Sequence, residues 1–79
     1  MNIFEINQTQ VSIEQVSPFS GAVNRMTLNL PYASFLSGLE KWHKGVLIQN
    51  AFPMLSADER EFIMTGITPS EWNAAFPNT

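Results

Sequence analysis

Cysteine is absent from the sequence, histidine occurs once, and basic residues are few. Without cysteine the protein has no disulfide, no thiolate metal site and no cysteine nucleophile, so apolar residues must stabilise the fold. Four basic side chains face seven acidic ones, and the net charge of -3 argues against direct binding to nucleic acid through phosphate contacts. No apolar run approaches the roughly 20 residues of a membrane span, and the N-terminus lacks a basic signal region. We therefore expect a cytoplasmic protein that has no membrane partner.

The chain of 79 residues is short enough to limit its architecture. A chain of this size buries only about 60% of the surface that its unfolded form exposes, which supports one modest core. We expect a single small domain over residues 1–79, made of a β-hairpin part (1–30) and a helical part (31–79).

The net negative charge falls in the second half of the sequence. Acidic and basic residues cancel within residues 1–45, so residues 46–79 carry the whole net charge. The charged residues of this second half are Asp58, Glu59, Arg60, Glu61 and Glu71.

The N-terminal part shows the alternation of apolar and polar residues that is typical of half-buried strands. It occurs at residues 11–13 and again at 26–30, on either side of a loop that contains Pro18 and Gly21. This pattern predicts a two-stranded antiparallel hairpin. Residues 3–6 could extend the first strand, but the polar residues 7–9 interrupt the pattern.

The segment after Pro31 has the periodicity of a helix. Apolar residues recur at spacings of three and four from Tyr32 to Lys44, and Gly45 is suited to end the helix. Gly38 in the middle of this helix predicts close approach by another element. Residues 46–52 form a further apolar segment, which we interpret as a short helix.

Two capping boxes mark the helices of the C-terminal part. Ser56 with Glu59 and Thr68 with Glu71 have the required spacing, and Pro69 suits a first helical position. We predict helices over 56–65 and 69–76, with an inward face formed by Phe62, Ile63, Trp72 and Phe76. The expected fold is therefore α+β, a two-stranded antiparallel β-hairpin followed by three or four short α-helices.

Neither catalytic nor metal-binding residues can be assigned from the pattern. His43 is the one side chain with an ordinary pKa near neutrality, yet of its neighbours only Glu40 could orient it as a general base. The acidic run 58–61 includes no histidine or cysteine and is better explained as a helix start. We predict a protein that is not an enzyme and has no cofactor.

The two capped helices also resemble a helix-turn-helix in outline. The second helix, however, offers Glu71 and Asn73 to a ligand and contains no lysine or arginine. A small DNA-binding regulator is therefore the alternative interpretation, and an αα-hairpin that packs or meets a protein is favoured.

Nine of the residues are aromatic, a load that a core this small cannot easily enclose. Phe19, Tyr32 and Phe52 are the aromatic residues least explained by helical stripes; they either anchor a partner or close the ends of the core. Asp58 and Glu61, at the acidic helix start, would suit a basic partner surface. These five residues are the predicted partner-binding site.

Two strings of residues add a resemblance to this interpretation. They are Gln49-Asn50-Ala51-Phe52-Pro53-Met54-Leu55-Ser56 and Thr65-Gly66-Ile67-Thr68-Pro69. With these strings, residues 45–76 resemble a group of very short proteins encoded by bacteriophages and other bacterial mobile elements. The resemblance implies a setting and no catalytic residues. We therefore expect a non-enzymatic protein that binds a host protein or nucleoprotein complex, such as a defence complex, in the bacterial cytoplasm and modulates or inhibits it; self-association is a further possibility.

Overall fold

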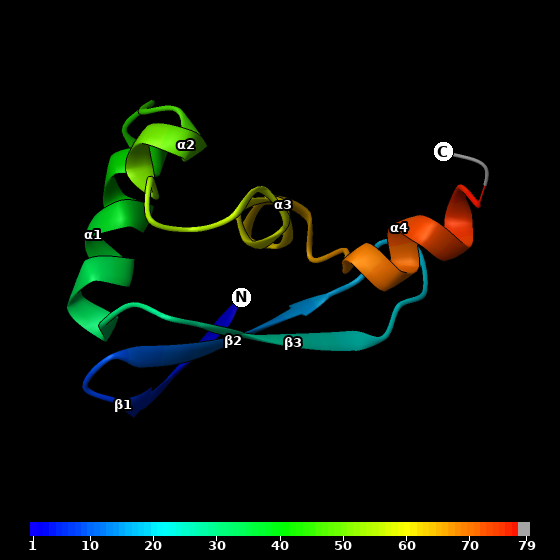
Figure 1. Cartoon of the computed structure of the whole chain (residues 1–79), viewed down its shortest axis with the longest axis horizontal. Helices are drawn as coiled ribbons and strands as arrows, with labels where there is room; N and C mark the ends of the chain where they lie inside the picture. The colour runs from blue at the N-terminus through cyan, green and yellow to red at the C-terminus, as the bar shows by residue number, and fades with distance from the viewer. Residues whose placement is uncertain (78–79) are drawn as a thin grey trace.

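The first thirty residues form an antiparallel sheet of three strands, so the expected two-stranded hairpin is one strand short. The structure is a computed structural model that describes residues 1–77; Asn78 and Thr79, the end of the predicted helical part, lie outside the described residues. Its strands are β1 (Asn2–Asn7), β2 (Gln10–Val16) and β3 (Val23–Leu28), in the order β1-β2-β3 (Figure 1). The helices are α1 (Tyr32–His43), α2 (Ile48–Ala51), α3 (Ala57–Thr65) and α4 (Pro69–Ala75). The α+β class and the number of helices are confirmed.

The additional strand results from a tight turn at the polar residues 7–9. The Asn7 Oδ1 atom accepts hydrogen bonds from the Thr9 amide at 2.9 Å and from the Thr9 hydroxyl at 3.1 Å. An asparagine side chain that bonds two residues ahead in this way reverses the chain without a glycine. β1 then pairs with β2, Ile3 opposite Ile13, with an irregularity between Glu5 and Asn7. The interruption in the pattern is therefore a turn.

The predicted hairpin is present as β2 and β3, which pair from Val11 opposite Leu28 to Val16 opposite Val23. The loop between them turns around Ser17, whose buried hydroxyl accepts from the amides of Phe19 at 3.1 Å and Ser20 at 3.3 Å. The serine thus satisfies loop amides that have no partner in the sheet.

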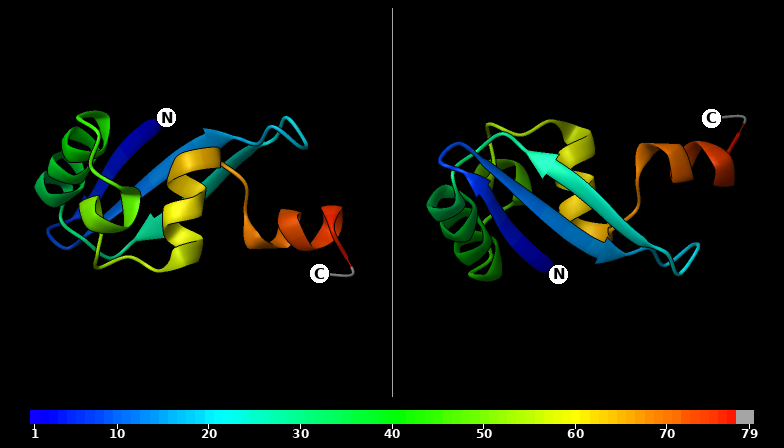
Figure 2. Two further views of the ribbon diagram at one scale, coloured as in Figure 1. Left: turned by 90° about the horizontal axis from the view of Figure 1, so that it is seen from above. Right: turned by 90° about the horizontal axis from the view of Figure 1, so that it is seen from below.

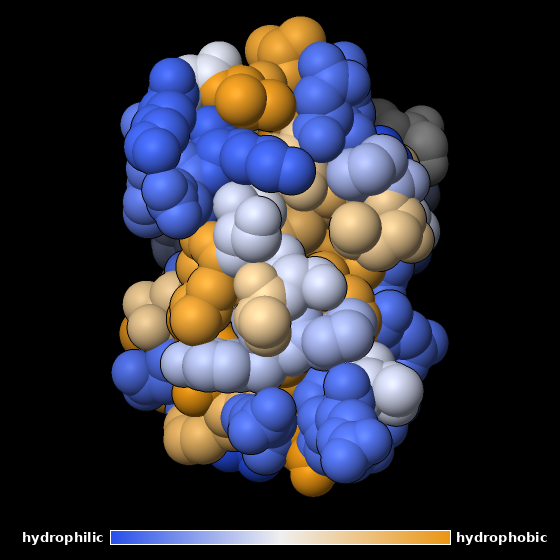
Figure 3. Space-filling view, turned by 90° about the vertical axis from the view of Figure 1, so that its left-hand side faces the viewer, coloured by the Kyte–Doolittle hydropathy of each residue, from blue (hydrophilic) through white to orange (hydrophobic). Residues whose placement is uncertain are grey.

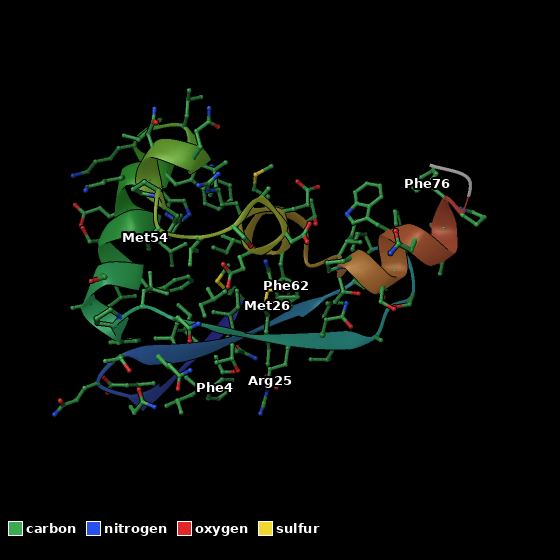
Figure 4. All side chains as sticks on the ribbon, in the orientation of Figure 1. Phe4, Arg25, Met26, Met54, Phe62 and Phe76 are labelled. Carbon is green, nitrogen blue, oxygen red and sulfur yellow. The ribbon has the colours of Figure 1, made fainter. Side chains whose placement is uncertain are left out.

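The helices lie on one face of the sheet and enclose the core against it (Figure 1). The strand register places Ile3, Ile13 and Met26 on the covered face, and Figure 4 shows Met26 and Phe62 between the sheet and α3. The buried apolar cluster consists of Val11, Ile13, Leu28, Leu30, Phe35, Ala51, Phe52, Leu55, Phe62 and Ile63. The core therefore joins β2 and β3 to the first three helices.

The close approach predicted at Gly38 is made by the ring of Phe52. A Cβ atom at Gly38 would stand 2.3 Å from Cε1 of this ring, whose centroid also lies 5.5 Å from that of Phe35. Phe52 is fully buried. Of the two roles predicted for it, the structure gives Phe52 the one in the core, where it fills the space that the missing side chain of Gly38 leaves between α1 and α2.

α3 is attached to the sheet at its C-terminal end. The Gln15 side-chain amide donates to the carbonyl of Phe62 at 2.9 Å and to that of Ile63 at 2.7 Å, so it satisfies two carbonyl groups of the last turn. The helix ends at Gly66, whose φ of 76° lies in the left-handed region that favours glycine.

Both predicted capping boxes are present, at Ser56 with Glu59 and at Thr68 with Glu71. The inward face is confirmed for α3, where Phe62 and Ile63 are buried, but not for α4, which contains no buried residue. Phe76 is 45% exposed, so its predicted inward position is wrong. Both views of Figure 2 explain this difference, since α1 and α2 lie at one end of the sheet and α4 projects beyond the other.

Candidate functional site

α4 is held to the sheet by polar contacts with the β2–β3 loop and the start of β3. The Ser20 hydroxyl donates to Oε2 of Glu71 at 2.8 Å. The Asn24 side-chain amide donates to Oε1 of Glu71 at 2.6 Å and to the carbonyl of Gly66 at 2.9 Å. These bonds fix the first turn of α4 although the helix has no buried residue.

Glu71 has two structural roles at the same time. Besides accepting from the hairpin, its Oε1 atom accepts from the Thr68 amide at 3.2 Å, which completes the capping box. The Ser20 hydroxyl is the main reason why the pKa of Glu71 lies below its ordinary value. Desolvation is the second-largest effect and raises the pKa, whereas Thr68, Ser17 and Asn24 each lower it by less. The negative charge of Glu71 is therefore used within the fold.

Three aromatic side chains meet where the loop touches α4, and we call them the aromatic cluster: Phe19, Trp72 and Phe76. The ring of Phe19 meets Trp72 edge-on at a centroid distance of 5.4 Å, and Phe76 stacks on Trp72 at the same distance. Phe19 is 47% exposed. Figure 4 shows Phe76 at the far end of α4, away from the core. The cluster is therefore a surface feature that orients the indole of Trp72.

A groove of about 450 Å³ lies between α3 and α4, and we call it the acidic groove. Asp58 and Glu61 line it from α3, and Trp72 lines it from α4. The remaining lining residues are Ala57, Pro69 and Asn73. Two carboxylates and an indole thus share one concave surface.

The carboxylates of the acidic groove have no partner within residues 1–77. Neither Asp58 nor Glu61 makes a side-chain hydrogen bond or an ion pair there, whereas Glu14 pairs with Arg25 and Glu40 pairs with Lys44. Arg60, the one basic residue of the sequence between 46 and 79, donates instead from Nε to the carbonyl of Phe52 at 3.0 Å. The groove therefore presents uncompensated negative charge.

The structure places the predicted site residues in three different parts of the molecule. Phe19, Asp58 and Glu61 lie beside α4. Trp72 connects the aromatic residue with the two acidic ones, because it contacts Phe19 and lines the groove. Tyr32 is the first residue of α1, the helix that lies at the opposite end of the sheet (Figure 2). Its side chain is 36% exposed. Phe52 is buried in the core and offers no surface to a partner in this fold.

Trp72 is the site residue that the sequence pattern did not indicate. Its helical spacing with Phe76 indicated an inward face. The signal against that prediction is the length of the helix, which has seven residues and no further apolar stripe. Such a helix cannot bury a large face.

The contacts of His43 do not assemble a general base. Its ring stacks on the neighbouring Trp42 at a centroid distance of 5.9 Å, and Glu40, the predicted orienting carboxylate, forms an ion pair with Lys44 at 2.8 Å. Within residues 1–77 no three histidine, cysteine or acidic side chains are grouped so that they could hold a metal ion.

A second concave surface lies between α1 and α2 and has different chemistry. Its volume is about 390 Å³, and small or uncharged residues such as Ser34, Ser37 and Gly38 line it together with Lys41. Figure 3 views the molecule from this end, where hydrophilic residues gather above and below a band of mixed hydropathy. No aromatic ring is among its described lining residues, so it lacks the combination found in the acidic groove.

The open face of the sheet is the third exposed surface of note. Figure 4 shows Phe4 and Arg25 on this side, and the Arg25 guanidinium lies 5.3 Å from the centroid of the Phe4 ring. Val16 and Val23 are more than 60% exposed there. Arg25 also pairs with Glu14, so its charge is partly satisfied.

Comparison with known proteins adds no relative to this picture. The chain matches no protein-family model, and neither a curated protein nor a solved structure is significantly similar to it. No helix among residues 1–77 has the length and apolar character needed to cross a membrane. The resemblance to phage-encoded proteins stays a prediction.

Proposed function

We propose that the protein is a non-enzymatic protein-binding module that acts through the acidic groove and the adjoining aromatic cluster. One observation carries this proposal: Asp58 and Glu61 are unpaired within the described chain and share a groove with Trp72. Charged groups placed this way gain a partner only when another molecule supplies it, and exposed aromatic residues beside them are typical anchors of protein interfaces.

The partner proposed here is a host protein or nucleoprotein complex in the cytoplasm of a bacterial cell. The resemblance of residues 45–76 to short phage-encoded proteins supports this setting. An acidic groove suits a basic surface, and many basic surfaces of nucleases and defence complexes hold nucleic acid. Occupying such a surface would modulate or inhibit the partner.

The alternative of a DNA-binding regulator receives less support from the geometry. In a helix-turn-helix the second helix enters the major groove of DNA. Here α4 contains no basic residue and borders a groove with two carboxylates, which repel phosphate. Absence of a gel shift at about 0.1 M salt is the result that our proposal predicts.

Capture from a bacterial lysate tests the proposal. Tagged protein should retain a stoichiometric partner that is lost from the double variant Asp58→Lys, Glu61→Lys. The control is Glu5→Lys, Glu40→Lys, which makes the same change of charge at exposed positions outside the groove. Circular dichroism shows whether each variant keeps its fold, and light scattering shows whether the protein associates with itself. Finding no stoichiometric partner at low salt would contradict the proposal.

A further inference from the structure

We infer that the acidic groove binds an arginine side chain of the protein partner, with the guanidinium lying on the indole of Trp72 and bonded to Asp58 and Glu61. This inference rests on the proposed function and specifies the chemistry of recognition at its site. It commits the groove to one kind of occupant, a protein segment that presents arginine.

The arrangement of charge points to a cationic ligand. Asp58 and Glu61 are three residues apart on α3, a spacing that places both side chains on one face of a helix. Both line the groove, and no basic residue is among the lining residues described. Because Arg60 is bonded to the carbonyl of Phe52, it does not neutralise them. A ligand with a single positive charge would meet two carboxylates.

The chemistry of the groove lining favours arginine over lysine or a metal ion. A guanidinium is planar, so it can stack on an indole while its N–H groups bond carboxylates at its edge; an ammonium group has no such plane. Ala57 and Pro69 provide apolar contact for the methylene groups of the side chain. A metal site would need further ligands, and no group of three suitable ligands occurs within residues 1–77.

The aromatic cluster prepares the indole for this contact. Phe19 meets Trp72 edge-on with an interplanar angle of 84°, and Phe76 stacks on it at 30°. The hydrogen bond from Ser20 to Glu71 fixes the adjacent turn of α4. A side chain that is ordered before binding loses less conformational entropy on binding, so these contacts favour association.

A peptide titration followed by nuclear magnetic resonance tests the inference without the host partner. The probe is a short peptide with blocked ends and one arginine, and the control peptide contains neutral citrulline in its place. The protein has two tryptophans, so the indole N–H signal of Trp42 in α1 serves as an internal reference, assigned with Trp42→Phe. We expect the Trp72 signal to shift saturably with the arginine peptide, and the Trp42 signal to stay in place.

Charge removal completes the test. Asp58→Asn with Glu61→Gln should weaken arginine binding about tenfold, since hydrogen bonds to charged groups are stronger than neutral ones. The matched variant Glu5→Gln, Glu40→Gln should bind as the unmodified protein does. Equal shifts with the citrulline peptide, or arginine binding unchanged by Asp58→Asn with Glu61→Gln, would overturn the inference. A lysate partner retained by the Asp58→Lys, Glu61→Lys variant would instead contradict the proposed location of the interface, so the two failures are distinguishable.

Discussion

The Ser20 hydroxyl donates to Oε2 of Glu71 across 51 positions of sequence, at 2.8 Å. This bond, together with the contact of Phe19 with Trp72, joins the β2–β3 loop to a helix without buried residues. One wall of the acidic groove is therefore positioned by hydrogen bonds and half-exposed rings. Segments with few buried apolar contacts open locally at low free energy, so this end of the molecule should respond to small changes.

The first prediction concerns the charge of Glu71 and pH. Its pKa in the folded protein lies below the ordinary value of 4.5, chiefly because of the Ser20 hydroxyl. A lowered folded pKa contributes stability that is present above the unfolded pKa and is lost as pH falls through the folded pKa. Glu71→Gln should therefore destabilise the protein at neutral pH, and the difference from the unmodified protein should shrink below about pH 4.5. Denaturant unfolding across pH measures this difference.

A control isolates the network from the change of charge. Glu5→Gln removes one negative charge at an exposed residue of β1. Its stability relative to the unmodified protein should change with pH less than that of Glu71→Gln. A Glu71→Gln difference that stays constant from neutral pH to about pH 3 would show that the hydrogen bonds do not depend on the charge.

The second prediction compares two glycines that have nearly the same backbone conformation. Gly66 and Gly21 have φ angles of 76° and 74°, but an added Cβ would lie 2.9 Å from the Val16 carbonyl oxygen at Gly66 and meet nothing within 4 Å at Gly21. Gly21→Ala should cost about 1–3 kcal/mol from backbone strain alone. Gly66→Ala should cost about 1–3 kcal/mol more, because α3 must move away from β2. Equal free energies of unfolding for the two variants would contradict this account.

Local signals made the helix ends predictable from the sequence. Ser56 with Glu59 and Thr68 with Glu71 act over three residues, so pattern and structure agree there. Strand β1 was not predicted because the turn that pairs it with β2 depends on the side chain of Asn7. In the sequence, this residue looks like any polar interruption of the pattern. Such a turn becomes visible only when the partner strand is known.

The third prediction tests the close contact between α1 and the residue that follows α2. Gly38→Ala would place a Cβ 2.3 Å from Cε1 of the buried Phe52 ring. Alanine is favoured over glycine in a helix by about 1 kcal/mol, but overpacking costs about 1–3 kcal/mol and should exceed this gain here. We expect a net loss of stability, partly relieved when Phe52→Leu is added. Ser37→Ala at the neighbouring exposed position should leave stability within about 0.5 kcal/mol and is the control.

The site was less predictable than the fold because its parts come from distant segments. The acidic helix start supplied Asp58 and Glu61, and the loop supplied Phe19 as an unexplained aromatic residue. What the sequence could not indicate is the position of Trp72, which depends on the bonds from Ser20 and Asn24 to Glu71. Conversely, no sequence pattern explained Phe52, because the space beside Gly38 that it fills forms only when the chain folds.

The last prediction distinguishes the effect of Phe19 on the position of the Trp72 indole from its effect on the stability of the fold. Phe19 is 47% exposed and meets Trp72 edge-on, so Phe19→Ala should lower the free energy of unfolding by about 1 kcal/mol, close to the value of an aromatic pair. It should nevertheless alter the fluorescence of Trp72 in a Trp42→Phe background and weaken binding of the arginine peptide. Tyr32→Ala removes an exposed aromatic residue of α1, the helix at the opposite end of the sheet. It should change neither the fluorescence of Trp72 nor the binding of the arginine peptide. If both variants affect Trp72 equally, the aromatic cluster does not orient the indole, and α4 must be held by the Glu71 network alone.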